Sequence, residues 1–178
     1  MKLRLDLHTH CYEATGFARP TVATVEKIVA RIKAGGLDGI AITDHHNSSF
    51  GYEVRDMVDR FFPGAVLIIP GQEIEEGSME IVELYLPCDA TFRFVAHPGY
   101  PGQPDIGGRR LHGIEIENGG HNWHIDRQKV GETAEAAGLL LLSNSDAHYL
   151  EDIGRFYNDI TVEELCRRAG AGGRQVPR

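Results

Sequence analysis

Short runs of apolar residues recur along the chain and predict strands. Seven runs have the length and the β-branched or aromatic content typical of strands. They span residues 3–7, 39–43, 66–70, 81–86, 92–96, 113–116 and 139–143. Helix-like segments lie at about 20–34, 50–62 and 125–137, and a last helix begins near Thr161. This alternation predicts an α/β fold with a largely parallel sheet, either open or closed into a barrel.

The middle of the chain departs from the alternation. No helix of useful length separates the runs at 66–70, 81–86 and 92–96, so we expect hairpins there. A regular eight-unit barrel therefore does not fit. The end of the chain, residues 169–178, is rich in glycine and lacks apolar periodicity, which predicts a flexible tail after a single compact domain over residues 1–168.

Composition limits the classes of function. The chain has 178 residues, 42% of them hydrophobic and 25% charged, which suits one well-cored domain. The formal net charge of −8 argues against a large non-specific nucleic-acid surface. Three cysteines are too few for a disulfide framework and favour a reducing cytoplasm. The sequence begins without the apolar region of a signal peptide and has no membrane-length apolar stretch, so we expect a cytoplasmic protein without membrane contact.

Histidines collect where the predicted strands end. Six of the nine directly follow an apolar run, and strand ends are where α/β folds build their sites. These six are His8, His10, His45, His46, His97 and His148. Four carboxylates, Asp6, Asp44, Glu73 and Asp146, lie close to them along the chain.

The first and last clusters repeat one spacing. Residues two apart on an extended chain point the same way, so Asp6, His8 and His10 would share one face. A surface pair of histidines is the alternative interpretation. Asp146 and His148 follow a strongly apolar run, and their pairing with the first cluster favours the interpretation of both as metal ligands.

The second cluster holds Asp44, His45 and His46. We predict that His45 is a ligand and that Asp44 is a candidate catalytic residue that orients an imidazole. His46 is expected to be solvated.

Two further clusters supply a carboxylate and an imidazole. Glu73 follows the run that ends at Pro70 and could bridge two metals, whereas Glu76 is expected in a solvated loop and Glu75 is undecided. His97 enters a loop of glycine and proline that no helix can enter, which fixes its imidazole at a strand end, either as a ligand or as a buried structural histidine.

The segment GIEIENGGHNWHID offers two more histidines. We favour His121 as a ligand over His124, which falls where the next helix begins. Cys11, beside the first histidine pair, is expected to be a small packed residue and not a nucleophile.

The donors outnumber the needs of one ion, so two or three divalent ions, zinc, manganese or iron, are expected. A hydroxide that bridges such ions can hydrolyse phosphate esters. His148 is a candidate both as ligand and as catalytic residue. Arg19, Arg109 and Arg110 are candidates for binding the substrate phosphate, although an exposed basic loop explains the last two equally well.

The ordered motifs DLHTH, ITDHH, GQEIE, AHPGYP, IEIENGG and SDAH resemble those of the PHP family, named for its polymerase and histidinol phosphatase members. The resemblance spans residues 3–160. It implies a distorted seven-stranded (β/α) TIM-like barrel and a di- or trinuclear metal cluster. The positions that match the family's ligands are His8, His10, His45, Glu73, His97, Asp146 and His148, and the loop after IEIEN supports His121.

The chain departs from the family pattern in two places. Thr15 and Gly16 stand where many members carry an acidic residue or a histidine that helps to hold a third metal, and Glu13 is the candidate substitute. Asn144 and Ser145 stand where the family usually has glycine before SDAH.

The sequence thus predicts a metal-dependent phosphoesterase of phosphatase or nuclease type, acting on a small phosphorylated substrate such as a nucleotide or short oligonucleotide. An amidohydrolase that cleaves C–N bonds at the same metals is one alternative. A PHP module that holds metal without turnover is the other. Neither the substrate nor the oligomeric state follows from the sequence.

Overall fold

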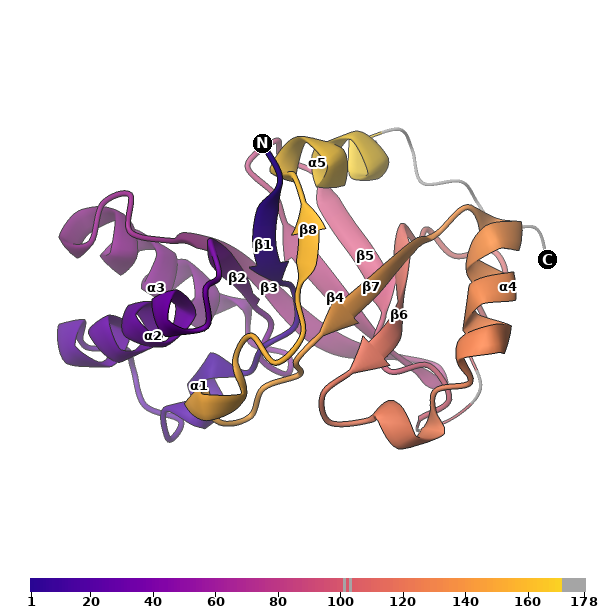
Figure 1. Cartoon of the computed structure of the whole chain (residues 1–178), viewed down its shortest axis with the longest axis horizontal. Helices are drawn as coiled ribbons and strands as arrows, with labels where there is room; N and C mark the ends of the chain where they lie inside the picture. The colour runs from indigo at the N-terminus through magenta and orange to yellow at the C-terminus, as the bar shows by residue number, and fades with distance from the viewer. Residues whose placement is uncertain (101, 103, 171–178) are drawn as a thin grey trace.

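A single eight-stranded sheet curves around an apolar interior in the computed structural model, which describes residues 1–100, 102 and 104–170 (Figure 1). The strands are β1 (Leu3–Asp6), β2 (Gly39–Ile42), β3 (Leu67–Glu76), β4 (Met79–Tyr85), β5 (Thr91–Val95), β6 (Gly113–Asn118), β7 (Leu140–Asn144) and β8 (Asn158–Ile160). The helices are α1 (Cys11–Ala14), α2 (Val22–Ala34), α3 (Ser48–Phe61), α4 (Arg127–Ala137) and α5 (Val162–Gly170), with 3₁₀ turns η1 (Asn122–His124) and η2 (Leu150–Asp152).

The order of strands in the sheet, β7-β6-β5-β4-β3-β2-β1-β8, follows the chain except for β8. Strands β1, β2 and β3 are parallel, as are β5, β6 and β7. Between them, β4 runs antiparallel to both β3 and β5, which agrees with the hairpins expected there. Each of the seven predicted runs overlaps a strand, but β8 makes eight, so the seven-stranded count was wrong.

The eighth strand nearly closes the barrel. It pairs antiparallel with β1, with Leu3 opposite Ile160. On its other side, the Asn158 side chain accepts a hydrogen bond from the Ser143 N–H (2.9 Å) and donates one to the Ser143 carbonyl (3.0 Å), which links β8 to β7. A three-residue strand with two polar positions has no apolar pattern, which is why the sequence did not indicate it.

Strand β3 is longer than predicted because it changes partner at Pro70. Its first half pairs with β2, where Pro70 lies opposite Ile42. From Gly71 onward it pairs with β4, and a Cβ at Gly71 would come 2.4 Å from the Glu83 carbonyl oxygen. The proline therefore marks the exchange of partners and does not end the strand. Glu73 lies inside β3 as a result.

Helices cover the outside of the barrel in two places. In Figure 1, α2 and α3 lie together against one side and α4 lies on the opposite side. The Thr21 hydroxyl accepts the Thr24 N–H and begins α2, and the Asn47 side chain caps α3 in the same way. The apolar faces of α2 and α3 bury one cluster against the sheet, and α4 buries another. In the described part of the chain no helix has both the length and the apolar content needed to cross a membrane.

The last helix covers the amino ends of the parallel strands. Leu165 of α5 is buried in the interior cluster with Ile160 and Phe92. A disulfide, which the sequence analysis did not foresee, joins Cys166 of α5 to Cys88 in the turn between β4 and β5. The helix includes Ala169 and Gly170, which had been assigned to the tail, and the rest of that predicted tail lies outside the described residues. Cys11 is a buried free thiol, as expected.

Candidate metal centre

The predicted ligands meet at the carboxyl ends of the parallel strands. In Figure 1 these ends point toward α1 and η1, away from α5. Within the described residues, the donor atoms form four overlapping groups, and in each group all atoms lie within 4.8 Å of one another. Together the groups contain His8, His10, Glu13, His45, Glu73, Glu80, His97, His121, Asp146 and His148.

The inner group, which consists of His8, His10, Glu73 and Asp146, is fully buried. Glu73 Oε2 lies 3.2 Å from His8 Nε2, 3.3 Å from His10 Nε2 and 3.4 Å from His45 Nδ1. Asp146 Oδ1 lies 3.1 Å from His10 Nε2. Although so many nitrogens surround it, Glu73 Oε2 makes no hydrogen bond. A carboxylate oxygen that faces several imidazole nitrogens in this way is suited to a shared cation.

The outer group consists of His10, Glu13, His45 and His148 and opens toward solvent. Glu13 Oε1 lies 3.8 Å from His45 Nε2, and Glu13 Oε2 lies 3.8 Å from His148 Nε2. The His10 Nδ1 atom is buried without a hydrogen-bond partner. Glu13, which is carried by α1, therefore brings a carboxylate among these histidines, and it stays the candidate for the donor that Thr15 and Gly16 do not supply.

Two side groups extend the inner group toward β4 and β6. His121 Nε2 lies 3.8 Å from Asp146 Oδ2, and the His97 ring lies beside it with a centroid distance of 4.5 Å. On the other side, His97 Nε2 lies 3.2 Å from both Glu73 Oε1 and Glu80 Oε2. The sequence analysis missed Glu80 because it occupies a strand position and not a strand end.

The two histidines after β6 take different positions. His121 reaches Asp146, whereas His124 turns away and donates from Nε2 to the His97 carbonyl at 3.3 Å. The geometry thus favours His121 over His124 as a metal ligand. Gly119 makes this approach possible, because a Cβ there would lie only 2.2 Å from the Ser145 carbonyl oxygen.

Unusual backbone angles turn two donors inward. His97 and Asp146 both have positive φ, 25° and 52°, a region that non-glycine residues rarely occupy. Such strained positions persist where the surrounding structure fixes them, and they cluster at functional sites. Here the two strained residues lie just after the ends of β5 and β7, and their side chains are directed into the centre.

Glu115 of β6 holds two donors of the centre in place through hydrogen bonds. The sequence analysis did not identify it either. This fully buried carboxylate accepts hydrogen bonds from His8 Nδ1 (3.0 Å), the His97 N–H (2.7 Å), Asn118 Nδ2 (2.8 Å) and Asn144 Nδ2 (2.8 Å). The bond to His8 leaves Nε2 of that ring free to face Glu73. Carboxylate–histidine pairs of this kind orient a ligand and raise its basicity.

Asp6 does not join the donors with which it was predicted to share a face. Its carboxylate accepts from the Ser145 hydroxyl (2.5 Å), the Ser145 N–H (3.1 Å) and the Gly154 N–H (2.9 Å). Burial raises the pKa of Asp6 to about 6. Asp6 and Ser145 therefore tie the loops after β7 to β1.

Asp44 also differs from expectation. No imidazole donates to it in the described structure; its Oδ1 instead accepts the Tyr12 N–H at 2.8 Å, while Oδ2 is buried without a partner. Burial raises the pKa of Asp44 to about 7. The contact with Tyr12 fixes the start of α1 and thereby the position of Glu13.

The acidic residues after Glu73 are both paired. Glu75 forms an exposed ion pair with His46, so His46 lies outside the centre, as predicted. Glu76 is not in a solvated loop: it pairs with Arg93 and Arg109 at the side of the sheet.

The predicted phosphate-binding arginines are scattered. Arg109 is held by Glu76 and by the Asp105 carbonyl, and Arg110 is exposed just before β6, where its charge acts on His112. Neither forms an ion pair with a donor of the centre among the described residues. Arg19 lines a small cleft of about 190 Å³ with Tyr12 and Asn47, beside the first turn of α3.

Electrostatics indicate that the centre is built for cations. Burial alone would raise the pKa of Glu73, but His8, His10 and His97 outweigh it and hold that pKa well below its usual range. Burial alone would lower the pKa of His10, but the neighbouring carboxylates of Asp146 and Glu73 raise it to about 9. The pKa values of His8, His10 and His97 are raised, so protons on these three rings would balance the carboxylates, whereas burial lowers the pKa values of His45 and His121. Divalent ions would replace these protons, because metal binding requires neutral imidazole and ionised carboxylate. Together with the unpartnered Glu73 Oε2 and His10 Nδ1, this chemistry fits divalent metal.

The chain resembles known proteins in sequence. Residues 124–172 match a family model described as PHP-associated. A protein of Syntrophotalea carbinolica described as a probable phosphatase is 28% identical over 193 residues, which cover 94% of this chain and 76% of that protein.

Solved structures share the fold at low sequence identity. PsfC from Pseudomonas syringae superposes with a TM-score of 0.67 at 18% identity and covers 92% of this chain and 87% of its own. A putative metal-dependent phosphoesterase from Bifidobacterium adolescentis gives 0.64 at 13%, covering 95% and 96%. An amidohydrolase from Chromobacterium violaceum, with bound sulfate and no metal, gives 0.62 at 17%, covering 92% and 96%.

Proposed function

We propose that the chain is a member of the PHP family and that it hydrolyses a small phosphate ester at two or three divalent ions held by the centre. The observation that carries this proposal is Glu73 Oε2, a buried carboxylate oxygen within 3.4 Å of nitrogens from His8, His10 and His45 and without a hydrogen bond. The similarity to a probable phosphatase supports a phosphate ester as the bond that is cleaved.

The overlap between groups supports more than one ion. His10 belongs to the inner and the outer group, and Asp146 to the inner group and that of His121. Shared donors would keep neighbouring ions close together, as in two-metal hydrolases. Zinc, manganese and iron all suit imidazole and carboxylate donors. When bound, such ions would lower the pKa of water and neutralise phosphate oxygens.

The remaining roles belong to residues around the donors. His148 is half-exposed at the mouth, and its Nδ1 donates to the Asp146 carbonyl at 3.0 Å, so its Nε2 faces Glu13 and is available as a ligand or to carry a proton. Asp44 acts by positioning α1, and Glu115 by orienting His8. Arg19 is the remaining arginine candidate for holding the phosphate. Arg109 is already paired with Glu76, which argues against that role for it.

The test compares two glutamates of β3. Glu73→Gln removes the shared carboxylate, whereas Glu75→Gln, two residues on, alters only an exposed pair with His46. We expect elemental analysis to find two or more ions per wild-type chain. We also expect Glu73→Gln to lose metal and to reduce phosphate release roughly a hundredfold or more, since even supporting residues of metal ligands are worth 10–100-fold. Glu75→Gln should match wild type.

Other outcomes separate the alternatives. Metal that binds stoichiometrically without release of phosphate from any tested ester would favour the idle module. Release from amides in preference to esters would favour the amidohydrolase, a reaction for which the Chromobacterium structure supplies only a shared fold. Absence of metal from all preparations would contradict the centre itself.

A further inference from the structure

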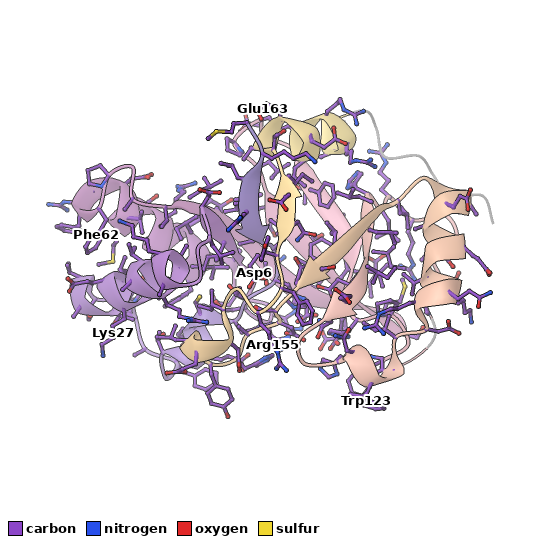
Figure 2. All side chains as sticks on the ribbon, viewed as in Figure 1. Asp6, Lys27, Phe62, Trp123, Arg155 and Glu163 are labelled. Carbon is purple, nitrogen blue, oxygen red and sulfur yellow. A yellow bond between two sulfur atoms is a disulfide. The ribbon has the colours of Figure 1, made fainter. Side chains whose placement is uncertain are left out.

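Exposed aromatic side chains gather around the mouth of the metal centre. Tyr100 follows His97 by three residues, Trp123 lies between His121 and His124, and Tyr149 directly follows His148. Trp123 is 77% exposed and Tyr100 is 43% exposed. Large apolar surfaces left in water cost free energy, so their concentration at one place indicates a binding surface. Figure 2 shows Trp123 at the lower edge of the molecule, on the side toward which β1 and β6 point.

The rings on the β6 side form a continuous surface, which we call the aromatic wall: Tyr100, His121, Trp123 and His124. Tyr100 stacks on His121, with centroids 4.9 Å apart and planes at 23°, and on His124 at 5.2 Å and 27°. Trp123 meets His124 edge-on at 4.6 Å and Tyr100 at 6.4 Å. Because His121 also faces Asp146, the wall leads from the proposed metal donors out to Trp123.

Among the described residues, the arginines near this surface do not form ion pairs with the metal donors. In the part of the chain that the structure describes, no arginine forms an ion pair with a donor of the centre, and Arg109 is already bound to Glu76. A substrate whose phosphate enters the centre would therefore place its remaining atoms against rings. Aromatic faces bind flat rings by offset stacking or edge contacts, and they favour them over saturated rings of the same size.

We propose that the substrate carries a flat aromatic or heteroaromatic ring close to its phosphate and that Trp123 and Tyr100 hold this ring. The inference rests on the proposed phosphoesterase function. It assigns to Trp123 a role in specificity, since its exposure leaves it little part in folding.

The test uses two phosphonates that cannot be hydrolysed, benzylphosphonate and cyclohexylmethylphosphonate. They share charge and nearly share size, but only the first has a flat ring. We expect calorimetry on the zinc-loaded protein to show about tenfold tighter binding of benzylphosphonate. Trp123 is the only tryptophan in the sequence, so its fluorescence should change when that ligand binds.

Three variants test whether the aromatic wall causes the preference for benzylphosphonate. Trp123→Ala should bring the two affinities to within about twofold while binding of cyclohexylmethylphosphonate persists, and Trp123→Phe should keep most of the preference. Phe61→Ala removes an exposed aromatic side chain at the far end of α3 and should change nothing. Equal affinities in wild type, or a preference that survives in Trp123→Ala, would overturn the inference.

The same ligands separate this inference from the proposed function. Preference for benzylphosphonate without release of phosphate from benzyl phosphate would support the wall and contradict the phosphoesterase. Equal turnover of benzyl and cyclohexylmethyl phosphate would support the phosphoesterase and contradict the wall.

Discussion

The two ends of the barrel bury different kinds of side chain. At the carboxyl ends of the strands, imidazoles and carboxylates such as His8, Glu73 and Glu115 are almost completely buried. At the amino ends, Phe92, Ile160 and Leu165 pack beneath α5, and a disulfide joins that helix to the β4–β5 turn. Buried ionisable groups cost stability unless they are paired, whereas apolar packing supplies it. The carboxyl end is therefore arranged for a ligand and the amino end for stability.

The largest effect is expected from Glu115→Ala at the carboxyl end. The change leaves four hydrogen-bond donors without their acceptor, which we expect to lower the free energy of unfolding of the metal-free protein by about 3–5 kcal/mol. Urea unfolding after chelation measures it. Glu117→Ala, two residues on in β6, is the control: this half-exposed carboxylate has only long contacts, and its loss should cost about 1 kcal/mol or less. Equal losses in the two variants would contradict the proposed importance of the buried network.

At the amino end, Cys166→Ser should lower the free energy of unfolding by about 2–4 kcal/mol, because the disulfide links residues 78 positions apart and restricts the unfolded chain. The gain in stability on adding metal should be the same in the variant as in wild type, since α5 lies away from the donors. Urea unfolding with and without zinc measures both quantities. Cys88→Ser and reduced wild type should match the variant. A reduced gain on metal addition would show that the two ends are coupled.

The smallest effect is expected at the seam between β7 and β8, where the barrel nearly closes. Asn158→Ala removes the hydrogen bonds that link β8 to β7, and we expect a loss of about 1–2 kcal/mol in the free energy of unfolding. Asp159→Ala, at the exposed neighbouring position, is the control and should stay within about 0.5 kcal/mol of wild type. Thermal unfolding distinguishes the two variants. A loss as large as that of Glu115→Ala would mean that closure, and not the buried network, dominates stability.

Much of the centre could be predicted because strand ends are visible in the sequence. Apolar runs end just before His8, His45 and His97, and parallel strands bring such ends to one edge of a sheet. The hairpins in the middle followed from linkers too short for helices. These features depend on local pattern, which a single sequence carries.

The residues that were missed depend on partners distant in sequence. Glu80 and Glu115 lie within strands, whereas the sequence analysis sought donors at strand ends, and the burial of Glu115 depends on the strands beside it. Charge alone did not show that Arg109 faces Glu76. Cys88 and Cys166 have no spacing that marks a pair. The cytoplasmic location stays a prediction, and this disulfide argues against it, since such bonds persist mainly in oxidising compartments.

The distribution of the inner group along the chain has a consequence for synthesis. His8 follows the first strand, and Asp146 follows the seventh. During translation, the early histidines emerge from the ribosome long before the late carboxylate that completes their group. A nascent or truncated chain that stops before residue 146 lacks one of the four side chains of the inner group, so metal uptake at the proposed centre would mark chains whose synthesis has passed that residue.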